Sequence, residues 1–151
     1  MKLLTILTIL PLLFFSISCS KANNTERFSA DGNVIEIRER LFIGQVNEIY
    51  LNAQNYIGKT IKLEGIFKQE QHDNKQYNFV VRYGPGCCGD DGLVGFEISW
   101  GETWIKEYPK INSWVEAIGE LRFNNENPEQ IYLDLSSLAV LDKRGAIFVP
   151  Q

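Results

Sequence analysis

Short runs of hydrophobic residues, many with polar residues at alternate positions, follow one another along the chain from about residue 34. Segments 60–67 and 93–100 alternate in this way, which is typical of strands with one face toward a core. Other runs are rich in Val, Ile, Tyr, Phe and Trp and are bounded by Gly, Asn, Asp and Pro. These runs predict further strands at 34–38, 41–46, 76–83, 113–121 and 131–135, with 138–141 continuing the last one.

One segment has helical spacing. Ile49, Tyr50 and Ala53 fall on one side of a helix within 48–55, and Gly58 is placed to end it. We therefore expect one helix of one or two turns between the first strands.

The strands at 60–67 and 76–83 predict a hairpin around a turn at 71–75. Pairing residues whose numbers sum to 146 places Phe67 opposite Phe79 on one face. The same register places Glu64 opposite Arg82 on the other face, where the two charges would form an ion pair. A slip of one residue would lose this match.

Five or six short strands and one small helix within about 115 residues favour a mainly β fold, because a closed barrel leaves no exposed sheet edge. We predict a small OB-like antiparallel barrel with one short helix. Gly65, Gly95 and Gly119 lie inside predicted strands and fit the sharp coiling that a small barrel requires.

The start of the chain predicts export. Lys2 precedes an apolar run over 3–15, and small residues precede Cys19, as in a secretory signal peptide covering 1–18. The run is shorter than the roughly 20 residues that a membrane-spanning helix needs. Cys19 resembles the acylated cysteine of bacterial lipoproteins, which becomes the mature N-terminus.

Three segments follow from this pattern: a signal peptide at 1–18, a lipidated N-terminus and flexible tether at 19–33, and an OB-like barrel domain at 34–148. We expect an extracytoplasmic protein that contacts a bacterial cell membrane through its lipid anchor.

Charge and composition limit the function. The chain has 15 Lys and Arg against 19 Asp and Glu, a net charge of −4, and no basic cluster, which argues against a nucleic-acid partner. It lacks a nucleophile beside a usable histidine, a phosphate-binding glycine loop and a histidine pair. We therefore predict no catalytic residues and favour a non-enzymatic role.

Adjacent cysteines in the glycine-rich segment 84–92 form the candidate site. In the first interpretation, the thiolates of Cys87 and Cys88 bind a metal ion such as zinc with the carboxylates of Asp90 and Asp91. Adjacent cysteines are poorly spaced for zinc, and His72, at the far end of a strand, would be about 20 Å away.

Two other interpretations stay open. An exported chain whose Cys19 is acylated leaves Cys87 and Cys88 only each other as partners, which predicts a vicinal disulfide. Such a bridge is strained, because adjacent Cα atoms lie about 3.8 Å apart, and it would act as a rigid loop element or a redox switch. Alternatively, both thiols are reduced and buried as small hydrophobic groups.

Segments 56–65, 79–82, 87–91, 94–96 and 114–119 together resemble an uncharacterised bacterial family. That family includes the soluble part of a proposed two-component membrane permease and has an OB-like domain with a paired-cysteine loop. The resemblance covers roughly 42–141 and implicates Cys87, Cys88 and either Asp90 or Asp91. It also implies a membrane-protein partner.

The sequence thus predicts an exported lipoprotein with a non-enzymatic OB-like binding domain, whose cysteine loop binds a metal ion or shapes a surface for a ligand or partner. The alternative is an extracytoplasmic thiol or redox-active protein that uses Cys87 and Cys88.

Overall fold

The computed structural model of the chain describes residues 34–85, 92–101 and 107–149. The predicted signal peptide and lipidated tether lie outside these residues. Within them, no helix is long and apolar enough to cross a membrane. The elements are β1 (Val34–Glu36), α1 (Phe42–Leu51), β2 (Thr60–His72), β3 (Lys75–Gly84), β4 (Gly92–Ser99), β5 (Trp114–Phe123) and β6 (Ile131–Val140), with 3₁₀ turns at Glu39–Leu41 and Ala53–Asn55.

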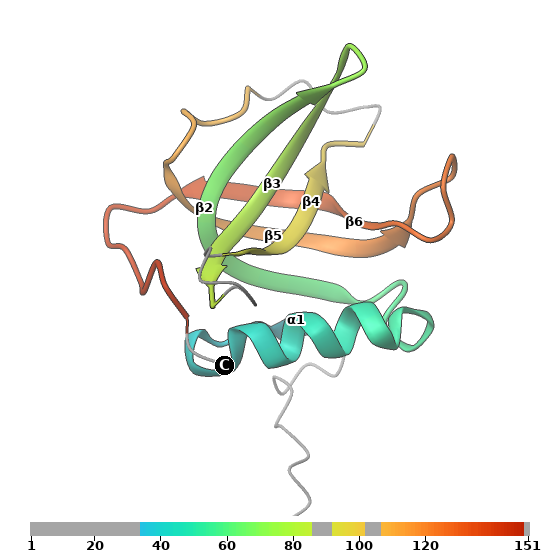
Figure 1. The fold of residues 1–151 in the computed structure, drawn as a ribbon, viewed down its shortest axis with the longest axis horizontal. Coiled ribbons are helices and arrows are strands. Elements are labelled where there is room, and N and C mark those ends of the chain that lie inside the picture. The colour runs from blue at the N-terminus through green and yellow to red at the C-terminus, as the bar shows by residue number, and fades with distance from the viewer. Residues whose placement is uncertain (1–33, 86–91, 102–106, 150–151) are drawn as a thin grey trace, which may run out of the picture.

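Five strands form a closed barrel in the order β2-β3-β4-β6-β5, and β5 returns to pair with β2 (Figure 1). The long strand β2 pairs with two neighbours, its first half with β5 and its second half with β3. The mainly β, OB-like barrel with one short helix is confirmed. One detail differs, since β4 and β6 pair in parallel and β1 adds a further parallel strand beside the start of β2.

Alternate positions of the strands fill the barrel. Phe67, Val80, Phe96 and Leu133 are completely buried, in agreement with the period-two pattern of their segments. Gly95 is required by close packing of β4 on β3, because a Cβ atom there would overlap the carbonyl oxygen of Val80. This contact explains the interruption of an otherwise apolar strand.

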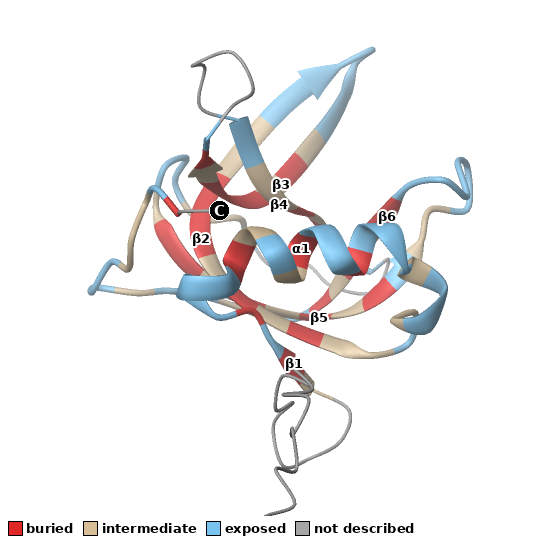
Figure 2. Cartoon of the chain, turned by 60° about the horizontal axis from the view of Figure 1, so that its bottom comes forward, coloured by how far each residue is buried: buried red, intermediate tan, exposed pale blue. Residues whose placement is uncertain are grey.

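The prediction of a strand at 41–46 is wrong, because Leu41 ends a 3₁₀ turn and the rest of this segment belongs to α1. Phe42, Val46 and Ile49 recur at intervals of four and three and are buried together on one side of the helix. The helix therefore begins earlier than expected and lies across one end of the barrel (Figure 2). Gly58, with a φ of +80°, lies beyond its end and leads into β2.

The predicted hairpin exists, but its register is wrong by one residue. The observed pairs sum to 147, so that Phe67 faces Val80 and Lys68 faces Phe79. The cause is the turn, in which only Asp73 and Asn74 separate the strands, with φ values of +49° and +61°. A two-residue turn of this kind has its centre between two residues rather than on one.

Candidate functional site

The cysteine loop connects β3 to β4. Its described neighbours Gly84 and Gly92 lie opposite each other at the end of the β3–β4 ladder. Cys87, Cys88, Asp90 and Asp91 lie outside the described residues, as does Cys19 at the chain start. The metal, disulfide and lipidation assignments at these residues therefore stay predictions.

Nothing else in the described ranges offers a metal site. No group of three or more His, Cys, Asp or Glu side chains in this part of the chain is arranged to hold a metal ion. His72 pairs with Lys75 at the hairpin tip, whereas Gly84 marks the opposite end of β3. The histidine thus lies at the opposite end of the hairpin from Gly84, which precedes the cysteine loop.

The outer face of β2, β3 and β4 presents side chains in cross-strand rows. One row consists of Lys68, Phe79 and Glu97, which face one another across the three strands. Beside it, Val81 is opposite Gly95, which carries no side chain. An aromatic ring is therefore flanked by a cation on one side and an anion on the other.

A shallow groove of about 230 Å³ runs over these rows. Its floor is apolar, its rim is charged, and the end of α1 closes one side. The lining residues are Tyr50, Lys68, Glu70, Phe79, Val81, Leu93, Gly95 and Glu97.

Glu97 is partly buried in this groove. Desolvation by its surroundings raises the pKa of its carboxyl group. The Tyr50 hydroxyl donates a hydrogen bond to the Gly95 carbonyl oxygen at 3.1 Å. Burial of this hydroxyl, together with the nearby Glu97 charge, raises the pKa of Tyr50 to about 12. Glu97 is therefore partly shielded from water, whereas the Tyr50 residue as a whole is 47% exposed.

The C-terminal segment, residues 141–149, extends the outer face of β2, β3 and β4. Tyr83 forms a parallel bridge with Phe148, in which the Tyr83 amide donates to Ile147 and its carbonyl accepts from Val149, both at 2.9 Å. The Tyr83 and Phe148 rings stack with centroids 5.4 Å apart. Lys68 Nζ lies 5.7 Å from the Tyr83 ring centre, so this aromatic pair adjoins the groove.

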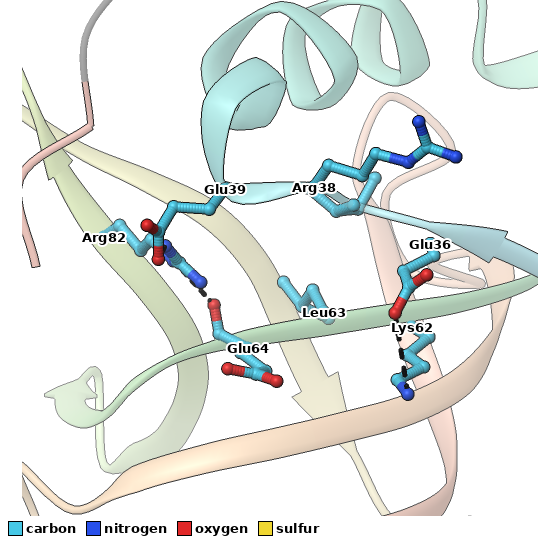
Figure 3. A pocket seen from close by; sticks show the side chains of 8 residues that line it. Glu36, Arg38, Glu39, Lys62, Leu63, Glu64 and Arg82 are labelled. Atoms are coloured by element: carbon cyan, nitrogen blue, oxygen red, sulfur yellow. Dashed lines mark hydrogen bonds and ion pairs between the residues drawn. The ribbon is translucent and has the colours of Figure 1, made fainter. Parts of the chain in front are cut away.

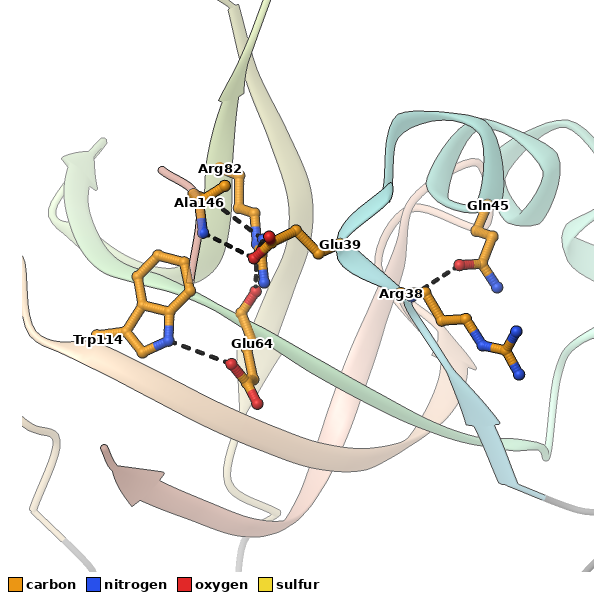
Figure 4. Close-up of polar contacts among 7 residues, drawn as sticks. All are labelled: Arg38, Glu39, Gln45, Glu64, Arg82, Trp114 and Ala146. Atoms are coloured by element: carbon orange, nitrogen blue, oxygen red, sulfur yellow. Dashed lines mark hydrogen bonds and ion pairs between the residues drawn. The ribbon is translucent and has the colours of Figure 1, made fainter. Parts of the chain in front are cut away.

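Arg82 holds the C-terminal segment from inside the barrel (Figure 4). Its side chain is only 3% exposed. Nε donates to the Glu64 carbonyl oxygen at 2.8 Å, and Nη1 donates to Glu39 Oε2 at 2.9 Å and to the Ala146 carbonyl oxygen at 3.1 Å. The guanidinium carbon lies 4.9 Å from the Phe42 ring centre and 4.8 Å from that of Trp114.

Glu39 completes this contact. Its Oε2 also accepts the Ala146 amide at 2.7 Å, so both backbone polar groups of Ala146 are bonded by one ion pair. The hydrogen bond from Ala146, then that from Arg82, lowers the pKa of the Glu39 carboxyl group. Gly145 leaves room for this arrangement, since a Cβ atom there would lie 2.5 Å from Glu39 Oε2.

The prediction of an ion pair between the Glu64 and Arg82 side chains is wrong. Arg82 contacts the backbone of Glu64, while the Glu64 carboxylate accepts the Trp114 Nε1 hydrogen at 3.3 Å. With the register at 147 rather than 146, Arg82 is not paired with Glu64 on an exposed face. It projects inward, as Val80 does, into the end of the barrel.

A pocket of about 350 Å³ adjoins Arg82 (Figure 3). Three acidic and three basic side chains line it, and its cations are already engaged. Lys62 Nζ lies 3.0 Å from Glu116 Oε2 and 3.6 Å from Glu36 Oε1, and Arg82 pairs with Glu39. This balance of charge leaves little attraction for an ionic ligand and indicates a structural role. The lining residues are Glu36, Ile37, Arg38, Glu39, Lys62, Leu63, Glu64 and Arg82.

Sequence reasoning missed Glu39, Ala146 and Phe148. The sequence did give an indication at Arg82. This residue lies two positions after Val80 and therefore on the same inward face of the strand, where a charge requires internal partners. No local pattern identifies those partners, which lie 43 and 64 residues away in sequence.

Comparison with known proteins adds the family. The model of the DUF1980 C-terminal domain matches residues 17–145, which is most of the chain. No curated protein matches the sequence. The family match carries no information on the lipoprotein signal or on the permease similarity, which stay predictions. This chain belongs to the DUF1980 C-terminal domain family.

Proposed function

We propose that this protein is the binding domain of an exported, lipid-anchored protein, and that it binds a partner at the outer face of β2, β3 and β4. The observation that supports this most directly is the groove over Phe79 and Val81, with the exposed side chains of Leu93 and Phe148 close by. Apolar side chains exposed together, with charges at the rim, are typical of interaction surfaces.

The fold agrees with this role. OB-like barrels bind their ligands on one strand face and the loops beside it. Here Gly84 and Gly92, which flank the cysteine loop, pair at the end of the β3–β4 ladder, and the C-terminal segment adds Phe148 beside Tyr83. The DUF1980 family match is compatible with a binding role and assigns no reaction.

The cysteine loop has a supporting role in this proposal. Cys87 and Cys88, with Asp90 and Asp91, bind a metal ion or otherwise shape the loop at the end of the binding face. Zinc content of the untagged protein, measured against a Cys87→Ser, Cys88→Ser double variant, tests the metal arm. Zinc in the wild type alone supports that arm, and equally negligible zinc in both proteins removes it.

A thiol or redox role for Cys87 and Cys88 is the second candidate, favoured by their adjacency in an exported chain. Thiol titration with and without reductant tests it. Two thiols that appear only after reduction support a disulfide, and two free, unreactive thiols under oxidising conditions contradict it.

Site-specific photo-crosslinking tests the binding face. A photoreactive phenylalanine analogue replaces Phe148 or, as a matched control, Val140, because both side chains are 60% exposed and Val140 lies at the end of β6. In membranes of the native cell, we expect adducts from position 148 and none from position 140. Equal adducts at both positions, or none at position 148, would contradict the proposal.

A further inference from the structure

The groove contains a carboxylate for which the described residues provide no counter-ion. Glu97 is partly buried, and in the described ranges it has neither a hydrogen bond nor an ion pair. The groove's own cation is engaged elsewhere, because Lys68 Nζ donates to Asn112 Oδ1 at 2.8 Å and lies over the Tyr83 ring. A carboxylate removed from water in this way gains more than an exposed one from an incoming cation.

Two aromatic side chains lie in the groove with this carboxylate. Phe79 is its cross-strand neighbour, and Tyr50 lines the same groove from α1. Aromatic rings attract cations at their faces, and a planar guanidinium stacks on a ring while it donates paired hydrogen bonds to a carboxylate. Carboxylate and rings together therefore favour a guanidinium over a neutral group or an anion.

The size and charge of the groove indicate what kind of molecule carries the guanidinium. At about 230 Å³ the groove is smaller than the roughly 300 to 1,000 Å³ of pockets that enclose a whole small-molecule ligand. It suits one side chain better. Glu70 adds a second negative charge to the rim, and the chain as a whole carries a net charge of −4.

We propose that the groove binds an arginine side chain of a protein partner, whose guanidinium pairs with Glu97 beside Phe79 and Tyr50. This inference rests on the proposed binding role of the same face and specifies its chemistry. Leu93 and Phe148 then contact apolar surface of the partner around the inserted arginine, an arrangement typical of interface hot spots.

Nuclear magnetic resonance titration of the isotope-labelled, intact protein tests the assignment. The probes are N-acetyl-arginine methylamide, its neutral isostere N-acetyl-citrulline methylamide, and N-acetyl-lysine methylamide. We expect the arginine probe to shift the amide resonances of Phe79, Gly95 and Glu97, to bind at least about 10-fold more tightly than citrulline, and to bind more tightly than lysine.

Two variants provide the matched comparison. Glu97→Gln should weaken arginine binding at least about 10-fold, whereas Glu129→Gln, which removes an equal charge from an exposed loop, should change it less than about twofold. If the thermal unfolding midpoint of Glu97→Gln equals or exceeds that of the wild type, the loss of arginine binding is not caused by a folding defect.

Several results would overturn the inference: citrulline or lysine binding as tightly as arginine, full affinity in Glu97→Gln, or no shift of groove resonances at the highest soluble probe concentration. If adducts at position 148 persist in any of these cases, the face binds its partner through other chemistry, and only the arginine assignment fails.

Discussion

Arg82 Nη1 lies 2.9 Å from Glu39 Oε2, and this ion pair joins β3 to the turn before α1. The guanidinium is buried while the Glu39 side chain is 48% exposed. The pair encloses the backbone of Ala146 and thereby sets the path of the C-terminal segment toward Phe148. The interior of the barrel thus positions part of the proposed binding face.

Replacing Arg82 should destabilise the fold strongly. Arg82→Met leaves the carbonyl oxygens of Glu64 and Ala146 without this donor, and we expect a loss of about 3 kcal/mol in the free energy of unfolding. Arg122→Met, at an exposed ion pair with Asp134, should cost less than about 1 kcal/mol. Urea unfolding of both variants checks the difference, and equal costs would contradict a structural role for Arg82.

Glu39 should make stability depend on pH. Its folded-state pKa is lowered, so its contribution is present above the unfolded value near 4.5 and is lost as the pH falls through the folded value. Glu39→Gln should therefore be less stable than wild type at pH 7, by no more than about 1 kcal/mol because the group is half exposed, and the gap should shrink toward pH 3. Thermal unfolding from pH 3 to 7 measures it. A gap that stays constant with pH would refute this explanation.

Gly145 should tolerate a side chain poorly. In Gly145→Ala the new methyl group meets Glu39 Oε2 at 2.5 Å and Trp114 Cζ2 at 3.0 Å, so the C-terminal segment must shift. We expect a loss of about 1 kcal/mol and faster amide exchange at Tyr83 and Val149, which bond across this segment.

Gly44 provides the matched control for this substitution. It lies inside α1 with nothing within 4 Å of an added Cβ atom, so Gly44→Ala should stabilise the protein by about 0.5 to 1 kcal/mol. If both alanine substitutions destabilise the protein, the cost of Gly145→Ala is not specific to the contact at Gly145.

The β2–β3 turn should depend on Asn74. At a φ of +61°, Asn74→Ala should cost about 1 kcal/mol, whereas Asn74→Gly should be neutral or stabilising, because glycine accepts this conformation without a steric penalty. Chemical unfolding of the two variants separates backbone strain from loss of the amide group. Equal costs in alanine and glycine would indicate the latter.

The predicted lipid anchor can be tested directly. We expect the intact mature protein to have the mass of a chain that begins at an acylated Cys19, and Cys19→Ser to move the protein from the membrane to the soluble fraction. A full-length product that keeps Met1, or an unchanged distribution of the variant, would contradict the anchor.

Alternation predicted the strands well because each barrel strand has one buried face, as Phe96 and Ile98 show. It failed at 41–46, where Leu41, Phe42 and Val46 fit a short strand as readily as a helix until the series is extended to Ile49. The hairpin register failed because charge matching of Glu64 with Arg82 outweighed the length of the turn.

The candidate site was less accessible to sequence reasoning than the fold. The cysteine loop was recognisable by composition alone, whereas the groove depends on which outward side chains of three strands become neighbours. Within its strand pattern Glu97 is an ordinary outward carboxylate, and it is the neighbouring Phe79 and Tyr50 that place it in the groove. Such groupings come from the register between strands and from the position of α1, which no local pattern encodes.

The hydrogen bond between Ala146 and Glu39 joins positions 107 residues apart. A ribosome must therefore synthesise the chain as far as Ala146 before Glu39, just ahead of α1, can acquire this partner. This contact is consequently among the late ones to form as the domain is synthesised, and a chain that ended before Ala146 would leave the guanidinium of Arg82 without the carbonyl oxygen to which Nη1 donates.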